Sequence, residues 1–339
     1  MADKKPHTVS MTDVAAKAGV STMTVSRVIS GTGAVKPATA ERVQAAAEAL
    51  GYVINKTSAS FSTQRSHTIG VILPANGYRG TYVKLLDGIS GVLSAKGYEM
   101  LVGYDQTSTE MCANVAIKFL SHRVDGLLIV GTDYLSQISK FCQSCQTPVV
   151  QVFEDAPNPI GTSLGCSHLQ MGATITQHLL ERGYQDILAV QSCATLEQNR
   201  FTERNRGIHS VLDPLGISLR THNVDYTLDL EGANKLLQEL CEQDRLPQVL
   251  LLHQEYFAFG VLLAAQRLGL RIKDDLAIAS FGWTELSRYT CPSLTVVWAD
   301  IFEMGKQAAE VLLNQIEGQE QPSRPIISFS HELIRGEST

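Results

Sequence analysis

Apolar residues recur at helical spacing through the first fifty residues. Ser10 is a candidate helix N-cap, and the apolar face of residues 11–18 ends at Gly19. A second amphipathic segment follows Ser21, and a third covers residues 38–50, where apolar positions follow the i, i+3, i+4, i+7 pattern. The pattern therefore predicts a small head of three helices.

From residue 68 onward the pattern changes, because short apolar runs alternate with helix-length amphipathic segments. The runs predicted to be strands are 69–73, 100–104, 126–130, 149–153, 187–190, 249–252, 276–280 and 294–298. The helices predicted between them are 81–95, 109–121, 168–182, 200–213, 229–243, 255–268 and 300–316. Alternation of this kind predicts parallel sheets with helices on both faces. Because a single core stops growing at roughly 250–300 residues, we expect two α/β lobes.

Helix ends in this second region share one signature. An apolar residue follows a glycine at four positions, which is typical of a left-handed C-cap that turns the chain toward the next strand. These glycines are Gly97, Gly183, Gly216 and Gly269.

Composition limits the class of protein. The chain has 339 residues, of which 44% are hydrophobic and 18% charged, so a packed core is expected and wholesale disorder is not. Apolar runs stay well short of the roughly 18 residues of a membrane span, and the polar N-terminus predicts no secretion. Seven scattered cysteines favour reduced thiols, so we expect a cytoplasmic protein without a membrane partner.

Charge separates the head from the remainder. Residues 1–65 hold eight Lys or Arg and four Asp or Glu, a net charge of +4. Of the 28 basic and 34 acidic residues in the whole chain, 20 and 30 remain, a net charge of −10. A basic head on an acidic body indicates a polyanion partner for the head only.

The head also contains a helix-turn-helix pattern. The first helix ends at a tight turn at Gly19, and the second helix then presents its N-terminal side chains for a DNA major groove. Arginine suits guanine, threonine and methionine methyl groups suit thymine, and hydroxyl groups suit phosphates. The candidate DNA-contacting residues of this helix are Ser21, Thr22, Met23, Thr24, Ser26 and Arg27. From spacing alone, an ordinary capped helical hairpin is an equal alternative.

The segment DVAAKAGVSTMTVSR at residues 13–27 closely resembles the signature of the lactose/galactose-repressor family of bacterial transcription regulators. The resemblance continues through LGY at 50–52, TIGVIL at 68–73, VDGLLI at 124–129, PSLTV at 292–296, and Gly305. Within the family, the chain looks most like repressors that regulate the use of gluconate-type sugar acids.

This resemblance implies a division of the chain into three parts. Residues 1–54 would form the all-α helix-turn-helix domain, residues 55–67 the hinge helix and linker, and residues 68–339 a two-lobed body like periplasmic sugar-binding proteins. It also implies a homodimer that binds a palindromic double-stranded operator and responds to a small effector held between the lobes. No cofactor and no metal is expected.

The hinge departs from the family pattern. Asn55 matches a family position, and Phe61 stands where a leucine wedge usually enters the minor groove, a role that an apolar phenylalanine can fill. The residue before Asn55 is Ile54 rather than the usual proline, and residues 58–59 are Ser-Ala rather than Ala-Arg. We therefore expect Asn55 and Phe61 to contact DNA through a hinge of altered sequence.

The family pattern also assigns two candidate effector-binding residues in different parts of the body. Arg204 and Gly207 match an Arg-x-x-Gly motif whose arginine holds ligand oxygens, and a guanidinium binds a carboxylate through two parallel hydrogen bonds. The alternative for Arg204 is a surface arginine at a helix start. Tyr82 matches an aromatic position after the first strand of the body.

Three further candidate effector-binding residues follow predicted strands in the C-terminal half of the chain. Gln254 and Glu255 match the family's Asn-Asp pair, whose carboxylate can accept sugar hydroxyls; alternatively, the acid stabilises a helix N-terminus. Trp283, in the run Phe-Gly-Trp at 281–283, lies where many members carry aspartates. Loss of those acids would favour an anionic ligand, and Trp283 would either stack on a sugar or cover the lobe junction. Residues 167–168, Ser-His in place of Asp-Asn, receive no interpretation.

Three classes of protein compete for the sequence. A sugar-binding transport component conflicts with the head and the absent signal segment, and an α/β enzyme lacks a catalytic constellation. Cys142 and Cys145 have redox-like spacing but lie in a helix-length segment, so ordinary thiols are expected. We therefore predict a DNA-binding repressor controlled by a gluconate or keto-gluconate type of effector; alternatives are a neutral sugar, a sugar phosphate or a phosphoprotein partner.

Overall fold

The computed structural model describes residues 9–30, 34–52, 65–74, 79–105, 109–131, 135–155, 158–192, 199–282, 284–319 and 326–339. The chain forms two compact units, Met1–Ser66 and His67–Thr339. The predicted hinge residues Asn55 and Phe61 and the predicted effector residue Trp283 lie outside the described residues.

The described part of the N-terminal unit contains the three predicted helices. They are α1 (Met11–Ala18), α2 (Thr22–Ser30) and α3 (Pro37–Leu50). Ser10 and Asp13 form a capping box before α1, and Gly19 ends that helix at a φ of 65°. The helices pack through a small core of Val14, Ala15, Ala18, Val25, Val43 and Ala46.

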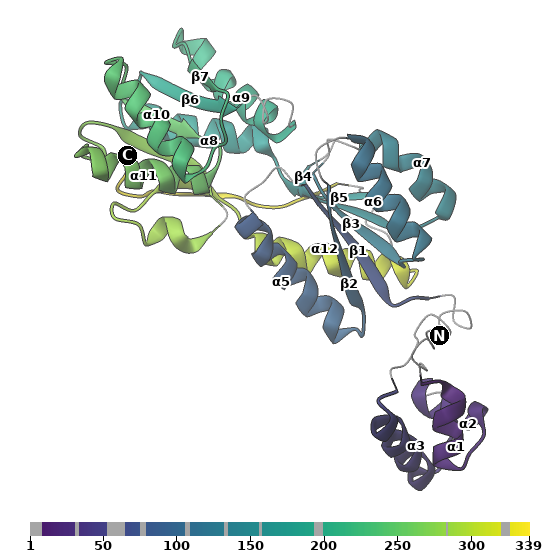
Figure 1. Cartoon of the computed structure of the whole chain (residues 1–339). Coiled ribbons are helices and arrows are strands. Elements are labelled where there is room, and N and C mark those ends of the chain that lie inside the picture. The colour runs from purple at the N-terminus through teal and green to yellow at the C-terminus, as the bar shows by residue number, and fades with distance from the viewer. Residues whose placement is uncertain are drawn as a thin grey trace, which may run out of the picture. The chain divides into compact units, whose positions relative to one another are not determined.

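The second unit begins with the sheet of the N-lobe, in which six parallel strands have the order β11-β5-β4-β3-β1-β2. These strands are β1 (Thr68–Pro74), β2 (Glu99–Asp105), β3 (Gly126–Val130), β4 (Val149–Glu154), β5 (Thr162–Cys166) and β11 (Ile326–Ser328). Helices α5 (Arg79–Ala95) and α12 (Ile301–Ile316) cover one face, and α6 (Thr109–Ser121) and α7 (Leu135–Cys145) cover the other (Figure 1). The side chains of β1 alternate accordingly, since Val71 packs toward α5 and α12 and Ile72 toward α6 and α7.

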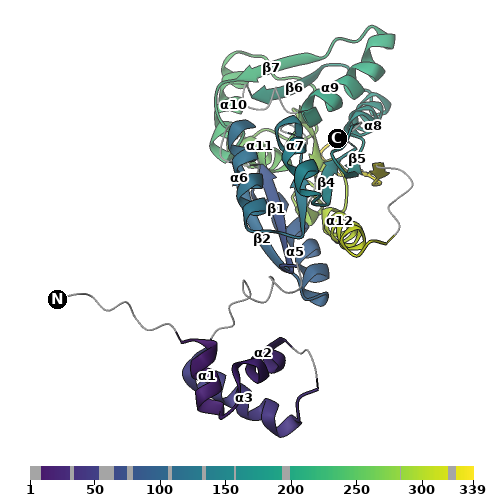
Figure 2. The same cartoon turned by 90° about the vertical axis from the view of Figure 1, so that its right-hand side faces the viewer.

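The C-lobe repeats this plan with the strand order β12-β10-β9-β8-β6-β7. Its strands are β6 (Ile187–Ser192), β7 (Arg220–Val224), β8 (Val249–Leu252), β9 (Ala277–Gly282), β10 (Thr295–Trp298) and β12 (Glu332–Ile334), of which only β12 is antiparallel to its neighbour. Helices α8 (His168–Glu181) and α9 (Asn199–Leu212) cover one face, and α10 (Leu230–Glu242) and α11 (Glu255–Leu268) the other (Figure 2). Two 3-10 turns, η1 (Asp213–Leu215) and η2 (Glu285–Arg288), follow α9 and β9.

The chain passes between the two lobes three times. It leaves the N-lobe sheet after β5 and enters α8, returns after β10 into α12, and passes back from β11 to β12. Figure 1 shows the yellow C-terminal segment, with α12 beside α5 and β12 in the other lobe. The crossings confirm the predicted fold class, an α/β body of two lobes resembling a periplasmic binding protein.

Two pairs of helices approach closely because glycines face their partner's backbone. A Cβ on Gly88 of α5 would collide with the carbonyl oxygen of Phe302 in α12, and a Cβ on Gly305 would meet that of Leu85. The same holds for α8 and α9, where Gly172 and Gly207 each lie against a backbone carbonyl of the other helix. The glycines therefore allow the backbones of each pair of helices to pack in direct contact.

The predicted helix ends are confirmed at all four glycines, whose φ angles lie between 67° and 90°. Within the described residues, no helix is both long enough and apolar enough to span a membrane. The two cysteines of α7, Cys142 and Cys145, are free thiols.

Candidate nucleic-acid interface and effector site

The N-terminal turn of α2 combines internal capping with an exposed outer face. Ser21 caps the helix, because Thr24 N donates to its Oγ at 3.2 Å and the two hydroxyl oxygens lie 2.9 Å apart. Val25 faces the core, whereas Thr22, Met23, Ser26 and Arg27 are exposed, and the Met23 side chain is 64% exposed. The first turn therefore presents a methyl group and a thioether, and Arg27 adds an exposed guanidinium in the last turn of the same helix.

Exposed cations occur on all parts of the same small unit. Lys17, Lys36 and Arg42 are exposed, as is Arg27, and they come from or flank all three helices. A basic surface of this kind attracts phosphates without reading sequence.

In the body, the parallel strands of both lobes end near the lobe junction. The strand order reverses between β1 and β3 in one sheet and between β6 and β8 in the other. Ligands of open α/β sheets bind outside the carboxyl ends of strands at such reversals. Asn199 at the start of α9 joins the two edges, since its Nδ2 donates to Glu154 Oε2 of β4 at 3.3 Å.

Arg204 is buried at this junction, not exposed at a helix start. Its side chain is 1% exposed; Nη1 donates to the carbonyl oxygen of His253 at 2.8 Å, and Nε donates to His168 Nδ1 at 3.3 Å. Its Cζ atom lies 4.1 Å from the ring centroid of Phe281, a cation–π distance. Gly207, the second residue of its motif, serves the contact between α9 and α8 rather than a ligand.

Burial controls the charge of Arg204. Desolvation, followed by the nearby charge of Arg200, lowers the pKa of Arg204 to about 9, while Glu154 acts in the opposite direction. The guanidinium is therefore still protonated at pH 7. A buried cation of this kind is a strong anchor for an anionic or oxygen-rich group.

Two histidines to which the sequence analysis assigned no role, His168 and His253, lie beside this arginine. Ser167 caps α8 by accepting from Gln170 N at 3.4 Å, which places His168 as the first residue of the helix, against Arg204. His253 follows β8, and neither of its ring nitrogens has a hydrogen-bond partner in the described part of the chain. The sequence could have indicated His253 as a site residue, because it directly follows a buried strand and directly precedes Gln254 and Glu255.

Carboxylates from the N-lobe approach the same place. Phe153 adopts a φ of 97°, which non-glycine residues rarely do, and Glu154 after it is only 4% exposed. Gly165 of β5 leaves room for this backbone, because a Cβ there would strike Phe153 and Glu154. Burial raises the pKa of Asp155, although a hydrogen bond from Ser167 opposes the shift.

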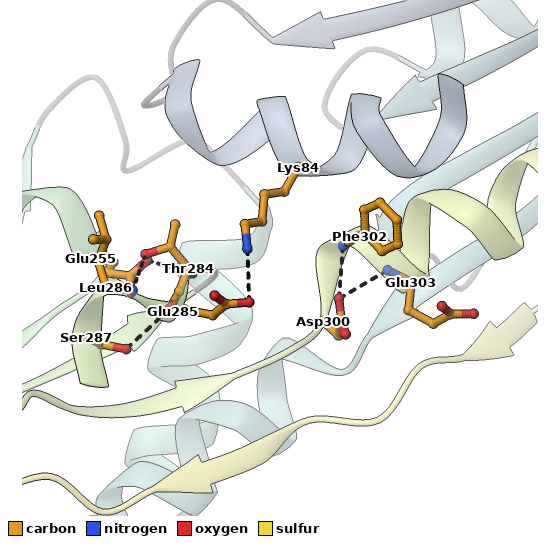
Figure 3. A network of polar contacts seen from close by, with 9 residues as sticks. All are labelled: Lys84, Glu255, Thr284, Glu285, Leu286, Ser287, Asp300, Phe302 and Glu303. Carbon is orange, nitrogen blue, oxygen red and sulfur yellow. Dashed lines mark hydrogen bonds and ion pairs between the residues drawn. The ribbon is translucent and has the colours of Figure 1, made fainter. Parts of the chain in front are cut away.

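Glu255 is held by the backbone across the C-lobe edge. It is 5% exposed, and its Oε2 accepts from Thr284 N at 3.0 Å (Figure 3). Its Oε1 would lie 3.1 Å from a Cβ on Gly282, so the glycine makes room for the carboxylate. Gln254 occupies the N-cap position of α11, half-buried and without a side-chain capping bond.

Tyr82 lies deeper than a ligand-lining position suggests. It is 2% exposed within the core of the N-lobe, and its ring meets that of Phe153 edge-to-face with centroids 6.1 Å apart. The structure thus brings Arg204, Gln254 and Glu255 to one edge of the C-lobe, whereas Tyr82 is buried in the N-lobe against Phe153. Within the described residues, no cluster of His, Cys, Asp or Glu is arranged to hold a metal ion.

Comparison with known proteins agrees with both units. The family model for bacterial regulatory proteins of the lacI family matches residues 10–55, and that for periplasmic binding protein-like domains matches residues 176–339. The chain belongs to the LacI family of transcriptional regulators. Its members are regulators of transcription, so the chain is not an enzyme.

Relatives and solved structures span the whole chain. The HTH-type transcriptional repressor CytR of Escherichia coli K12 is 27% identical over 338 residues, covering 99% of this chain and 98% of CytR. A LacI-family regulator from Silicibacter pomeroyi has a TM-score of 0.88 at 27% identity, covering 97% of this chain and 99% of that one. The Lac repressor dimer bound to operator and the anti-inducer ONPF has a TM-score of 0.80 at 24% identity, with 97% and 98% covered, and supports the fold.

Proposed function

We propose that this LacI-family regulator is a repressor that binds a palindromic operator as a homodimer, and that a small sugar acid at the lobe junction controls the binding. The observation that carries the first part is the exposed outer face of α2, where Met23 of the first turn and Arg27 of the last turn are open to solvent on a capped helix. A helix presented in this way suits the major groove, in which such N-terminal side chains read base edges.

The operator can be obtained by selection from a random palindromic DNA library, and Arg27→Ala then tests the assignment. Loss of a bidentate contact to guanine should weaken specific binding by about 1–3 kcal/mol, or roughly 5- to 150-fold. Lys17→Ala is the control, since removing a phosphate-directed charge should weaken all sequences alike. Equal operator affinity of wild type and Arg27→Ala in an anisotropy titration would refute the role of Arg27.

Homodimer formation is supported by exposed apolar residues on the body. Val83 of α5 is 54% exposed, and Leu286 and Tyr289 at η2 are 59% and 80% exposed. Val83 precedes Lys84 and Leu286 follows Glu285 in the chain, and Lys84 and Glu285 form an ion pair. Apolar exposure of this kind favours a protein interface, and two-fold symmetry matches a palindromic site.

The sugar-acid class of the effector is supported by Arg204, the buried guanidinium at the junction. A carboxylate would gain charge-assisted hydrogen bonds there. The gluconate-type subgroup, which the sequence resembles, belongs to the same proposal. A neutral polyol is the competing candidate, because the acids Glu154 and Asp155 lie at the same junction and Glu154 already acts on the charge of Arg204.

Arg204→Met tests the anchor while conserving much of its volume. It should reduce binding of gluconate or 2-ketogluconate by at least about tenfold, the loss expected for a charge-assisted contact, and leave ligand-free operator affinity within about twofold. Arg206→Met is the matched control, because Arg206 lies two residues away, is 64% exposed and pairs with Glu203. Titration calorimetry against gluconate, 2-ketogluconate and glucose separates the candidates. Binding of glucose alone would exclude the sugar acid but keep the regulator.

A further inference from the structure

His253 is enclosed by aromatic rings at the carboxyl edge of the C-lobe sheet. It is 3% exposed; its imidazole stacks on Phe281 with centroids 5.5 Å apart and planes 6° apart, and meets Phe201 edge-to-face at 5.2 Å. Arg204 lies over the same Phe281 ring and donates to the carbonyl oxygen of His253. The imidazole and the guanidinium therefore both contact the Phe281 ring, and a hydrogen bond joins Arg204 to the backbone of His253.

The imidazole is neutral. Burial and then the charge of Arg204 lower the pKa of His253 to about 3. A neutral imidazole offers one donor and one acceptor, and neither has a partner within the described chain. Buried polar atoms are nearly always paired in native proteins, so a histidine with two unpaired nitrogens calls for a partner that the chain itself does not supply.

His178 shows what an equally buried structural histidine looks like in this protein. It is also 3% exposed and also lies in the C-lobe, on α8. Its Nε2 bonds to Thr339 Oγ1 at 2.9 Å, so at least one of its ring nitrogens is used within the fold. His253 differs because its ring stands at the ligand-binding edge of the sheet and makes no such bond.

We propose that His253 is a specificity-determining residue of the effector site, which forms a hydrogen bond with a hydroxyl group next to the carboxylate held by Arg204. This inference rests on the proposed function and narrows it to a hydroxy acid. A hydroxyl can donate to and accept from the imidazole, whereas a keto oxygen can only accept. A site built around a hydroxyl also rejects analogues that lack it.

The test compares His253→Leu, His253→Gln and the control His178→Leu in the full chain, with D-gluconate and 2-ketogluconate as probes. Gluconate should bind the wild type more tightly than 2-ketogluconate. His253→Leu should lose about 10- to 100-fold in gluconate affinity, and His253→Gln, which keeps a donor and an acceptor, should recover part of it. Ligand-free operator affinity should stay within about twofold in both variants.

Thermal unfolding separates this role from a structural one. Without ligand, His253→Leu removes two unpaired polar atoms and should raise Tm by about 2–4 °C, whereas His178→Leu breaks a bond and should lower it. Unchanged gluconate affinity in His253→Leu, or a Tm lowered as in His178→Leu, would overturn the inference. If neither gluconate nor 2-ketogluconate binds the wild type, the proposed sugar-acid class is wrong and this inference is wrong with it, whereas gluconate binding that His253→Leu leaves unchanged refutes the inference alone.

Discussion

At the scale of single residues, the lobe junction is organised around one buried positive charge. Arg204 sits between His168 and the carbonyl of His253, and both histidines are kept neutral beside it. A second cation next to a buried guanidinium would cost several kcal/mol, so the imidazoles serve as polar but uncharged neighbours. This arrangement makes the protein sensitive to acid.

Protonation of these histidines should destabilise the fold. Burial lowers the pKa of His253 to about 3 and that of His168 well below its usual 6.5. Below pH 6.5 the unfolded chain therefore binds more protons than the folded one, so stability is complete above pH 6.5 and falls as the pH drops toward 3. Each histidine should contribute a loss of up to about 1.4 kcal/mol per pH unit.

Urea unfolding of the full chain at pH 7.5, 6.5 and 5.5 measures this slope, and comparison with His253→Leu isolates one histidine from the carboxylates. The variant should lose less stability than the wild type between pH 6.5 and 5.5, by about 1 kcal/mol. Parallel pH profiles for the two proteins would show that His253 is protonated in the folded state.

At the scale of secondary structure, most elements follow from hydrophobic periodicity. All eight predicted strands and all seven predicted helices of the body occur, each within about two residues of its expected ends. Four strands were not predicted. β7 is an edge strand of polar sequence with alternating burial, β5 has Leu164 as its one large apolar residue, and β11 and β12 have three residues each. None of them has the apolar run that identifies a buried strand.

The site was less predictable than the elements, for a physical reason. Arg204 and Glu255 belong to local motifs, so the sequence identifies them. The roles of Glu154 and His253 depend on contacts between distant segments: an unusual backbone angle at Phe153, and rings from α9 and β9 closing around an imidazole. Local patterns contain no information about such contacts.

Helix packing near the site gives a prediction at this scale. Gly207 lies one turn after Arg204, and an added Cβ would meet the carbonyl oxygen of Leu169, a backbone atom of α8 that cannot move alone. Gly207→Ala should therefore lower the free energy of unfolding by about 1–3 kcal/mol and weaken effector binding through displacement of Arg204.

Gly91→Ala is the matched control in α5. Gly91 is exposed, has no atom near its Cβ position and lies within a helix, so the substitution should stabilise the protein by about 0.5–1 kcal/mol. Thermal or urea unfolding measures both. The same sign for the two variants would mean that α8 and α9 separate more easily than their close approach indicates.

At the scale of the molecule, contacts between the lobes connect the site to the N-lobe. Glu255 accepts from Thr284 N, Thr284 Oγ1 accepts from Leu286 N, and Glu285 of the same turn pairs with Lys84 Nζ of α5 at 3.0 Å (Figure 3). Because α5 packs directly against α12 at its glycines, we expect Lys84 to move together with the N-lobe. An effector that moves the C-lobe edge at Glu255 would therefore favour either the formation or the breaking of the Lys84–Glu285 ion pair.

The Lys84–Glu285 pair should contribute to the choice between lobe arrangements, and by a small amount. Its side chains are 43% and 65% exposed, and exposed ion pairs contribute about 0.2–1 kcal/mol, so the expected effect on operator affinity is at most about fivefold. Lys84→Met and Glu285→Gln should move operator affinity in the same direction, and the double variant no further than either single one. The charge-swapped pair, Lys84→Glu with Glu285→Lys, should restore it.

The measurement is a double-mutant cycle on operator affinity by fluorescence anisotropy at one low salt concentration. Lys306→Met is the control, because Lys306 pairs with Glu303 within α12 and its removal changes the net charge equally without touching the lobe junction. If the four variants of the cycle and the control all shift affinity by the change in net charge alone, the pair does not couple the lobes to the head. Only a contact that differs between the two lobe arrangements can shift their populations. Non-additive effects of the Lys84 and Glu285 substitutions, together with an unchanged affinity in Lys306→Met, would therefore show that this ion pair couples the effector site to DNA binding.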